Sequence, residues 1–161
     1  MKIVFENSDR QASSRRDFCV RAGEAFSAAM LGSLLQACGG SATSPSAAPS
    51  LPVVGGSVAS GAVTVTIDSS SPLASVGGAA LVQSTAGNFL VARTAQDAFI
   101  ALTAICTHEG CTITGFQNAT YVCPCHGSQY NTSGRVVMGP ATIALRQFTT
   151  QFASNVLAIS L

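Results

Sequence analysis

The sequence predicts an all-β fold, an antiparallel sandwich or barrel with a subdomain inserted between its strands. Only 9% of the 161 residues are charged, so Glu, Lys and Arg, which favour helices, are scarce. The 15 glycines and the absence of tryptophan fit a β-rich domain better than a helical bundle. Several short segments alternate apolar and polar residues with period two, which is typical of strands. The length allows one such domain and an N-terminal appendage.

Charge is concentrated near the N-terminus. Five of the eight cations and four of the seven anions precede residue 25. The part after Cys38 keeps three charges of each sign and is formally neutral. A nucleic-acid-binding protein needs a basic face to displace counterions from phosphates, so the sequence excludes that class.

Residues 1–38 have the pattern of an export signal. S-R-R-D-F at 14–18 resembles the twin-arginine signature, and an apolar run of small residues follows over 25–37. This run is shorter than the roughly 20 apolar residues that span a bilayer. L-Q-A-C, ending at Cys38, resembles a lipobox, whose cysteine is lipidated and becomes the new N-terminus. The alternative is an uncleaved signal anchor in which Cys38 has no role.

Residues 39–60 are rich in Gly, Ser, Ala, Thr and Pro and carry no charge. Such a segment buries too little apolar surface to offset its chain entropy. We therefore predict a flexible tether here, followed by one folded domain over residues 61–161.

The predicted strands of this domain cover residues 63–67, 79–83, 89–93, 99–105, 143–149 and 155–160. The second and third flank a hairpin-like turn at 85–88, and the fourth runs directly into Cys106. Between the fourth strand and the last two lies the stretch 106–141, with four cysteines, both histidines and two glycine-rich loops. No internal repeat or second domain is visible.

Two motifs in that stretch indicate metal binding. The first loop, 106–111, reads C-T-H-E-G-C, and the second loop, 123–128, reads C-P-C-H-G-S. Both histidines of the chain lie in these loops, which a pair of ordinary core histidines would not explain. A structural Cys2His2 zinc site would use one Cys and one His of each loop. It would leave Cys111 and Cys125 without a role.

The two motifs resemble the cluster-binding loops of Rieske iron–sulfur proteins, and C-P-C-H-G-S is especially specific. The resemblance covers roughly residues 61–161, in detail only 104–141. It implies a 2Fe–2S cluster in which Cys106 and Cys123 bind one iron through thiolates. His108 and His126 would bind the other through imidazole Nδ1. The 14 residues between His108 and Cys123 are slightly fewer than usual in the family.

Charge explains why the ligands are mixed. Two ferric ions, two sulfides and two thiolates sum to zero with neutral imidazoles, whereas four thiolates would give a net charge of minus two. Reduction is therefore easier, and Rieske centres span about −150 to +300 mV against about −400 mV for plant-type ferredoxins. Exposed imidazoles can also titrate, so electron gain can be coupled to proton gain.

The resemblance further implies a disulfide between Cys111 and Cys125, as in the high-potential Rieske proteins of cytochrome bc-type complexes. Closing a loop of about 15 residues contributes roughly 3 kcal/mol in the chain-entropy model. Such a bond persists only in an oxidising compartment, which agrees with the export signal. Because the cluster is inserted in the cytoplasm, it must cross the membrane inside a finished fold.

Three more positions match the high-potential class. Ser128 and Tyr130 would donate hydrogen bonds to a bridging sulfide and to a cysteine ligand, which raises the potential. The alternative is an ordinary loop serine and a core tyrosine. The third loop, 139–141, reads G-P-A and resembles the proline-containing loop that shields the cluster, although an ordinary turn has the same composition.

The sequence thus predicts an electron-transfer protein without catalytic residues, anchored to the membrane and facing the periplasm or cell exterior. The favoured partners are a quinol-oxidising membrane subunit and a c-type cytochrome acceptor. One alternative is the electron-relay small subunit of a molybdenum-containing oxidase of the arsenite-oxidase kind. Another is the ferredoxin of a ring-hydroxylating oxygenase, which usually lacks the disulfide pair and the signal. A non-redox structural module is the remaining class.

Glu109 departs from the pattern of quinol-oxidising relatives, which usually carry Leu between the ligand histidine and the Gly-Cys pair. An unpaired carboxylate buried in an apolar socket costs several kcal/mol. Glu109 therefore favours a polar partner surface and a lowered potential. The alternative is a solvated loop residue without a role.

Overall fold

The computed structural model describes residues 48–161. The predicted export signal, Cys38 and residues 39–47 of the predicted tether lie outside these residues. Among the described residues there is no helix at all, and hence none that could cross a membrane.

Residues 48–161 form thirteen strands in three sheets. The five-stranded sheet has the order β1-β4-β5-β6-β11, the outer sheet β12-β13-β3-β2, and the inserted sheet β10-β9-β8-β7. The strands are β1 (Val53–Gly55), β2 (Ser57–Ala59), β3 (Ala62–Thr66), β4 (Ala79–Ser84), β5 (Gly87–Ala95), β6 (Ala98–Thr103), β7 (Gly115–Gln117), β8 (Thr120–Val122), β9 (Gln129–Asn131), β10 (Val136–Met138), β11 (Gln147–Phe148), β12 (Thr150–Ala153) and β13 (Val156–Ser160).

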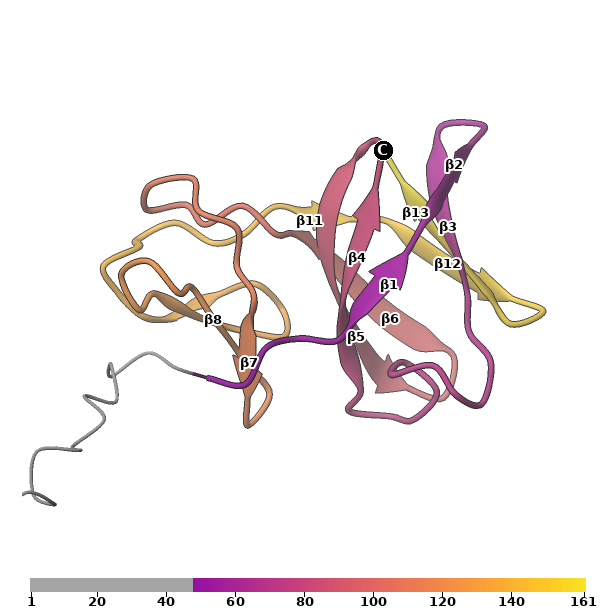
Figure 1. The fold of residues 1–161 in the computed structure, drawn as a ribbon, viewed down its shortest axis with the longest axis horizontal. Coiled ribbons are helices and arrows are strands. Elements are labelled where there is room, and N and C mark those ends of the chain that lie inside the picture. Colours follow the sequence, from indigo (N-terminus) through magenta and orange to yellow (C-terminus); the bar gives the residue numbers. More distant parts are fainter. Residues whose placement is uncertain (1–47) are drawn as a thin grey trace, which may run out of the picture. The chain divides into compact units, whose positions relative to one another are not determined.

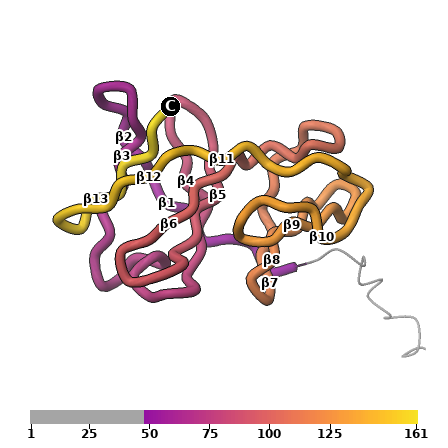
Figure 2. The backbone as a smooth tube through the Cα atoms, turned by 180° about the vertical axis from the view of Figure 1, so that it is seen from behind, coloured from indigo at the N-terminus to yellow at the C-terminus, as the bar shows by residue number. Residues whose placement is uncertain are grey.

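The inserted sheet lies between β6 and β11 in the chain and to one side of the other two sheets in space (Figures 1 and 2). The five-stranded and outer sheets together form the base of the domain. All strand pairs are antiparallel except β1 with β4. The predicted all-β fold with an inserted subdomain is therefore confirmed.

The five-stranded sheet has an apolar core on each of its faces. Successive side chains of a strand point to opposite faces, so neighbouring residues of one strand belong to different cores. In β5, Phe89 and Val91 belong to one apolar core with Val63 of the outer sheet. Leu90 alternates with them and belongs to a second core that contains Tyr130 of the inserted sheet. The central strands therefore join the base to the inserted subdomain through one shared layer.

The structure corrects the predicted tether for residues 48–60. Leu51 is buried in the second core, and Val53 pairs in parallel with Leu81. Gly56 also lies against the base, since a Cβ there would be only 2.5 Å from a Val63 methyl carbon. The fold therefore begins before residue 61, because pairing to a distant strand compensates for the poor local composition of this segment.

The other predicted strands differ mainly at their ends. The predicted strand at 143–149 shrinks to Gln147–Phe148, and Ile143 is exposed in the loop before it. The predicted strand at 99–105 ends at Thr103. No segment predicted as a strand corresponds to β12 or to the four strands of the inserted sheet.

Candidate metal centre

The first and second loops follow the same backbone path. In each, the N–H of the first cysteine, Cys106 or Cys123, donates to the carbonyl five residues on, at 2.8 Å. The N–H of the glycine four residues on, Gly110 or Gly127, donates back to the carbonyl of that cysteine. Both glycines have a φ of 74°, in the left-handed region that costs other residues a steric penalty. This is why both motifs have Gly at the fifth position.

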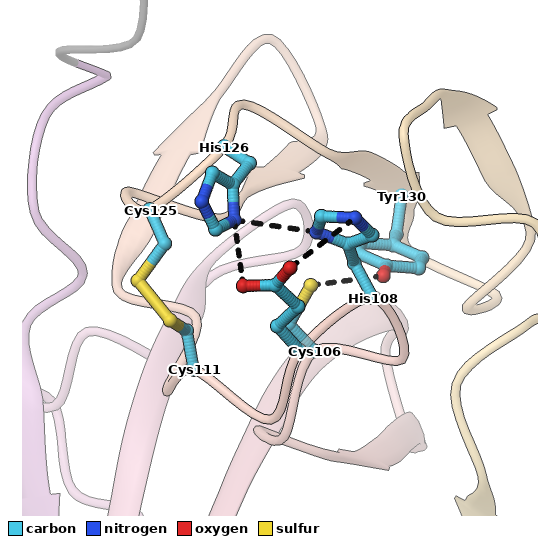
Figure 3. Close-up of a disulfide and its surroundings, with 7 residues drawn as sticks. Cys106, His108, Cys111, Cys125, His126 and Tyr130 are labelled. Atoms are coloured by element: carbon cyan, nitrogen blue, oxygen red, sulfur yellow. Dashed lines mark hydrogen bonds and ion pairs between the residues drawn. A yellow bond between two sulfur atoms is a disulfide. The ribbon is translucent and has the colours of Figure 1, made fainter.

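The shared path places two cysteines inside and two histidines outside. Cys106 follows β6 and Cys123 follows β8, and both are free thiols buried in the second core. His108 and His126 lie at the surface with their rings edge to face, 4.9 Å between centroids. Their Nδ1 atoms point toward each other at 3.2 Å (Figure 3). The loops therefore bring together the four predicted ligands as a pair of sulfurs and a pair of nitrogens.

Hydrogen-bond donors surround the two sulfurs. The Tyr130 hydroxyl lies 3.3 Å from Cys106 Sγ. Burial raises the pKa of Cys106, but donors that include Tyr130 and the His108 backbone N–H outweigh it and lower that pKa below its usual value. Burial raises the pKa of Cys123, although backbone N–H groups of the second loop also donate to its sulfur. Burial likewise raises the pKa of Tyr130, which keeps its hydroxyl protonated as a donor.

A disulfide links the two loops. It joins Cys111 to Cys125, the pair that the resemblance implied, with Cα atoms 6.5 Å apart (Figure 3). The bond connects the end of the first loop to the middle of the second. It therefore holds the two histidine-bearing loops together on the side away from Tyr130.

The third loop, extended here to residues 139–143, is bound to both cluster loops. The buried Ser128 hydroxyl accepts a hydrogen bond from the Ala141 N–H at 3.0 Å, and Ser128 is among the groups that lower the pKa of Cys106. The Thr107 hydroxyl donates to the Ile143 carbonyl at 2.6 Å. The G-P-A segment is therefore more than an ordinary turn, since its buried Ala141 packs in the second core.

Two further contacts at this site involve residues that are neither predicted ligands nor predicted hydrogen-bond donors. The hydroxyl of Thr107 lies 3.0 Å from that of Tyr130, and the only sequence signal for it is a hydroxyl next to a ligand cysteine. The Glu109 carboxylate lies 3.9 Å from His108 Nε2 and 3.7 Å from His126 Nδ1. No Lys or Arg pairs with this exposed carboxylate within residues 48–161.

Comparison with known proteins identifies the family. The model of the Rieske [2Fe-2S] domain family matches residues 65–149, more than half of the chain. This chain belongs to the Rieske family. That family transfers electrons, and its cofactor is a 2Fe–2S cluster.

Two relatives and one solved structure are similar to this Rieske protein. The cytochrome b6-f complex iron-sulfur subunit of Prochlorococcus marinus strain NATL1A is 44% identical over 75 residues, 44% of this chain and 42% of the relative. The chloroplastic subunit of Pisum sativum is 53% identical over 49 residues, 30% of this chain and 21% of the relative. The chain thus spans less than half the length of either relative. The plasma membrane Rieske protein PetC3 from Synechocystis PCC 6803 is 27% identical with a TM-score of 0.51, covering 60% of this chain and 99% of that chain.

The residues present fit a Rieske cluster. Two nitrogens that bind one tetrahedral metal at about 2.0–2.1 Å lie about 3.3 Å apart, and the two Nδ1 atoms are 3.2 Å apart. Two buried thiols provide sulfur ligands for a second iron, with several donors aimed at them. The disulfide accounts for Cys111 and Cys125, which a zinc site would leave without a role.

Proposed function

We propose that this Rieske protein transfers single electrons as the iron–sulfur subunit of a quinol–cytochrome c type electron-transfer chain. Its cluster is held by Cys106, His108, Cys123 and His126, and no residue is catalytic. The observation that carries the proposal is the convergence of two buried thiols and two facing imidazoles beside a disulfide. The similarity to cytochrome b6-f iron-sulfur subunits supports a membrane complex with a quinol-oxidising subunit, and a c-type cytochrome as acceptor.

The same proposal includes export and anchoring. The twin-arginine-like signal carries the folded domain to the outer face of the cytoplasmic membrane. Residues 39–47 tether it there, through lipid on Cys38 or through an uncleaved anchor. The disulfide between Cys111 and Cys125 supports this location, because such bonds persist only in oxidising compartments. The tether is thus shorter than the sequence predicted, since residues 48–60 belong to the fold.

Ser128 and Tyr130 tune the cluster in this proposal. Both side chains are buried, the Tyr130 hydroxyl lies 3.3 Å from Cys106 Sγ, and Ser128 helps to lower the pKa of Cys106. Hydrogen bonds to sulfur stabilise the extra negative charge of the reduced cluster, so they raise the potential. These hydrogen bonds support a high-potential Rieske centre rather than an oxygenase ferredoxin.

Metal analysis tests the proposal. Purified protein should contain two irons and two acid-labile sulfides per chain, and the reduced form should give the electron paramagnetic resonance signal of a mixed-ligand 2Fe–2S centre. Cys106→Ser should remove the cluster. Cys111→Ser serves as the matched control, because Cys111 lies in the same loop but outside the ligand set. Stoichiometric zinc without labile sulfide would contradict the proposal.

Glu109 favours a second candidate, the electron-relay subunit of a molybdenum-containing oxidase. Its carboxylate stands beside both imidazoles without a cationic partner among the described residues. Docking this tip into an apolar quinol site would bury that charge unpaired, at a cost of several kcal/mol. A polar partner surface avoids the cost.

Replacing Glu109 separates the two candidates. Glu109→Leu should raise the midpoint potential, because it removes a negative charge beside the cluster. If the partner is an oxidase, it should also slow transfer to that partner, and Glu109→Gln, which keeps the polarity, should slow it less. Inhibitor-sensitive quinol oxidation by a complex that contains the unmodified protein would exclude the oxidase candidate.

A further inference from the structure

The hydroxyl of Thr107 is the centre of a hydrogen-bond chain between the third loop and the cluster site. Its Oγ1 lies 2.6 Å from the Ile143 carbonyl oxygen and 3.0 Å from Tyr130 Oη. A carbonyl only accepts, so the single hydroxyl proton of Thr107 goes to Ile143. Toward Tyr130, Thr107 Oγ1 can therefore act only as an acceptor.

Tyr130 has one proton and two acceptors for it. Thr107 Oγ1 lies at 3.0 Å and Cys106 Sγ at 3.3 Å from the phenolic oxygen. The backbone N–H of Thr107 donates to the same oxygen at 3.2 Å, which uses part of its accepting capacity and leaves its proton free for the other two. The oxygen of Thr107 and the sulfur of Cys106 thus compete for one donor.

We propose that Thr107 is a positioning residue that divides the Tyr130 proton between its own hydroxyl and the Cys106 sulfur. It thereby holds the reduction potential below the value that Tyr130 would set alone. The inference rests on the proposed role of Cys106 as a cluster ligand. It goes beyond that role because it assigns to Thr107, the residue next to Cys106, an effect on the potential opposite to that of Tyr130.

Burial makes the competition effective. Tyr130 is fully buried and Cys106 is 2% exposed, so bulk water reaches neither the phenolic donor nor the sulfur, while the third member, Thr107, is half-buried. In such a low-dielectric site a hydrogen bond that is lost or gained has a larger effect than at the surface. The third loop also affects how the Tyr130 proton is shared, through the bond from Thr107 to the Ile143 carbonyl. Without that bond, Thr107 could donate its own proton to Tyr130, and the Tyr130 proton would then go to the Cys106 sulfur.

Thr107→Val tests the inference in the full-length holoprotein, because it keeps the shape of the side chain and removes the competing acceptor. The midpoint potential should rise, with an increase of about two- to tenfold in the equilibrium constant for reduction, the factor that a typical hydrogen bond contributes. Thr107→Ser keeps the hydroxyl and should leave the potential unchanged. Thr107→Ala, which also deletes the acceptor, should shift the potential in the same direction as Thr107→Val.

The Tyr130→Phe background separates competition from simple anchoring of the third loop. Without the phenolic proton there is nothing to divide, so Thr107→Val should have no further effect there. An equal shift in both backgrounds, a fall in potential, or no change would overturn the inference. Loss of the cluster from both Thr107→Val and Thr107→Ala would also overturn it, because Thr107 would then be a structural anchor. Wild-type protein without iron and labile sulfide would instead contradict the proposed function.

Discussion

Tyr130→Phe tests the tuning of the cluster directly, because it removes one donor and leaves the ring. A hydrogen bond to a charged group contributes about 1.5–3 kcal/mol. The bond to Cys106 is 3.3 Å long and Thr107 competes for its proton, so on the order of 1–2 kcal/mol is a better figure for it. For one electron, about 59 mV corresponds to a tenfold change in the equilibrium constant, which makes this about 40–90 mV. Since the oxidised cluster also accepts the bond, the potential should fall by part of that range, some tens of millivolts.

A redox titration followed by electron paramagnetic resonance measures the shift, and Tyr121→Phe provides a matched control. Tyr121 lies opposite Tyr130 in the β8–β9 pair and is equally buried. Its hydroxyl contacts no hydrogen-bond partner among the described residues. Tyr121→Phe should therefore leave the potential unchanged. An unchanged potential in Tyr130→Phe with the cluster intact, or the same fall in both variants, would refute the tuning role.

Three further predictions concern stability. Cys111→Ser should leave the cluster bound but release its iron faster during incubation with a chelator; mass spectrometry that finds both thiols free in protein from the cell envelope would contradict the disulfide. Leu51→Ala should lower the free energy of unfolding by about 2–5 kcal/mol in denaturant titrations. An effect near zero would mean that residues 48–60 belong to the tether and not to the fold. Hydrogen bonds from Ser70 lower the pKa of the exposed Asp68 carboxyl below its usual value. Its carboxylate therefore stabilises the fold above about pH 4 and loses this effect as the pH falls. The free energy of unfolding of Asp68→Asn should accordingly decrease less on acidification than that of the wild type, and an equal decrease would contradict this role.

Local patterns were sufficient to predict the main strands, and the resemblance of two loop motifs to a known family was sufficient to predict the cofactor. Apolar and polar residues alternate in β3 because every second side chain, at Val63 and Val65, faces the core between the two base sheets. The short strands of the inserted sheet gave no such signal, because three residues hardly define a period. The β1 segment was missed for a different reason. Its pairing partner, Leu81, is far along the chain, and composition within a window does not reveal a partner outside it.

The role of Thr107 could not be predicted for a related reason. Ile143 is 36 residues further along the chain, and only the folded third loop brings its carbonyl to the Thr107 hydroxyl. The sequence places a hydroxyl beside a ligand, but the direction in which that hydroxyl donates depends on this distant carbonyl. Hydrogen-bond direction, which decides the sign of the effect on the potential, is thus a property of the tertiary structure.

The two cluster loops show why their motifs were so informative. Both follow one backbone path, closed by the same two hydrogen bonds and requiring glycine at the same position. Along this common path, the histidine stands two residues after the cysteine in the first loop and three residues after it in the second. The disulfide cysteine is displaced in the opposite sense, from the end of the first loop to the middle of the second. The different spacings of C-x-H and C-x-x-H are therefore what allows two loops of the same shape to present facing imidazoles on one side and a disulfide on the other.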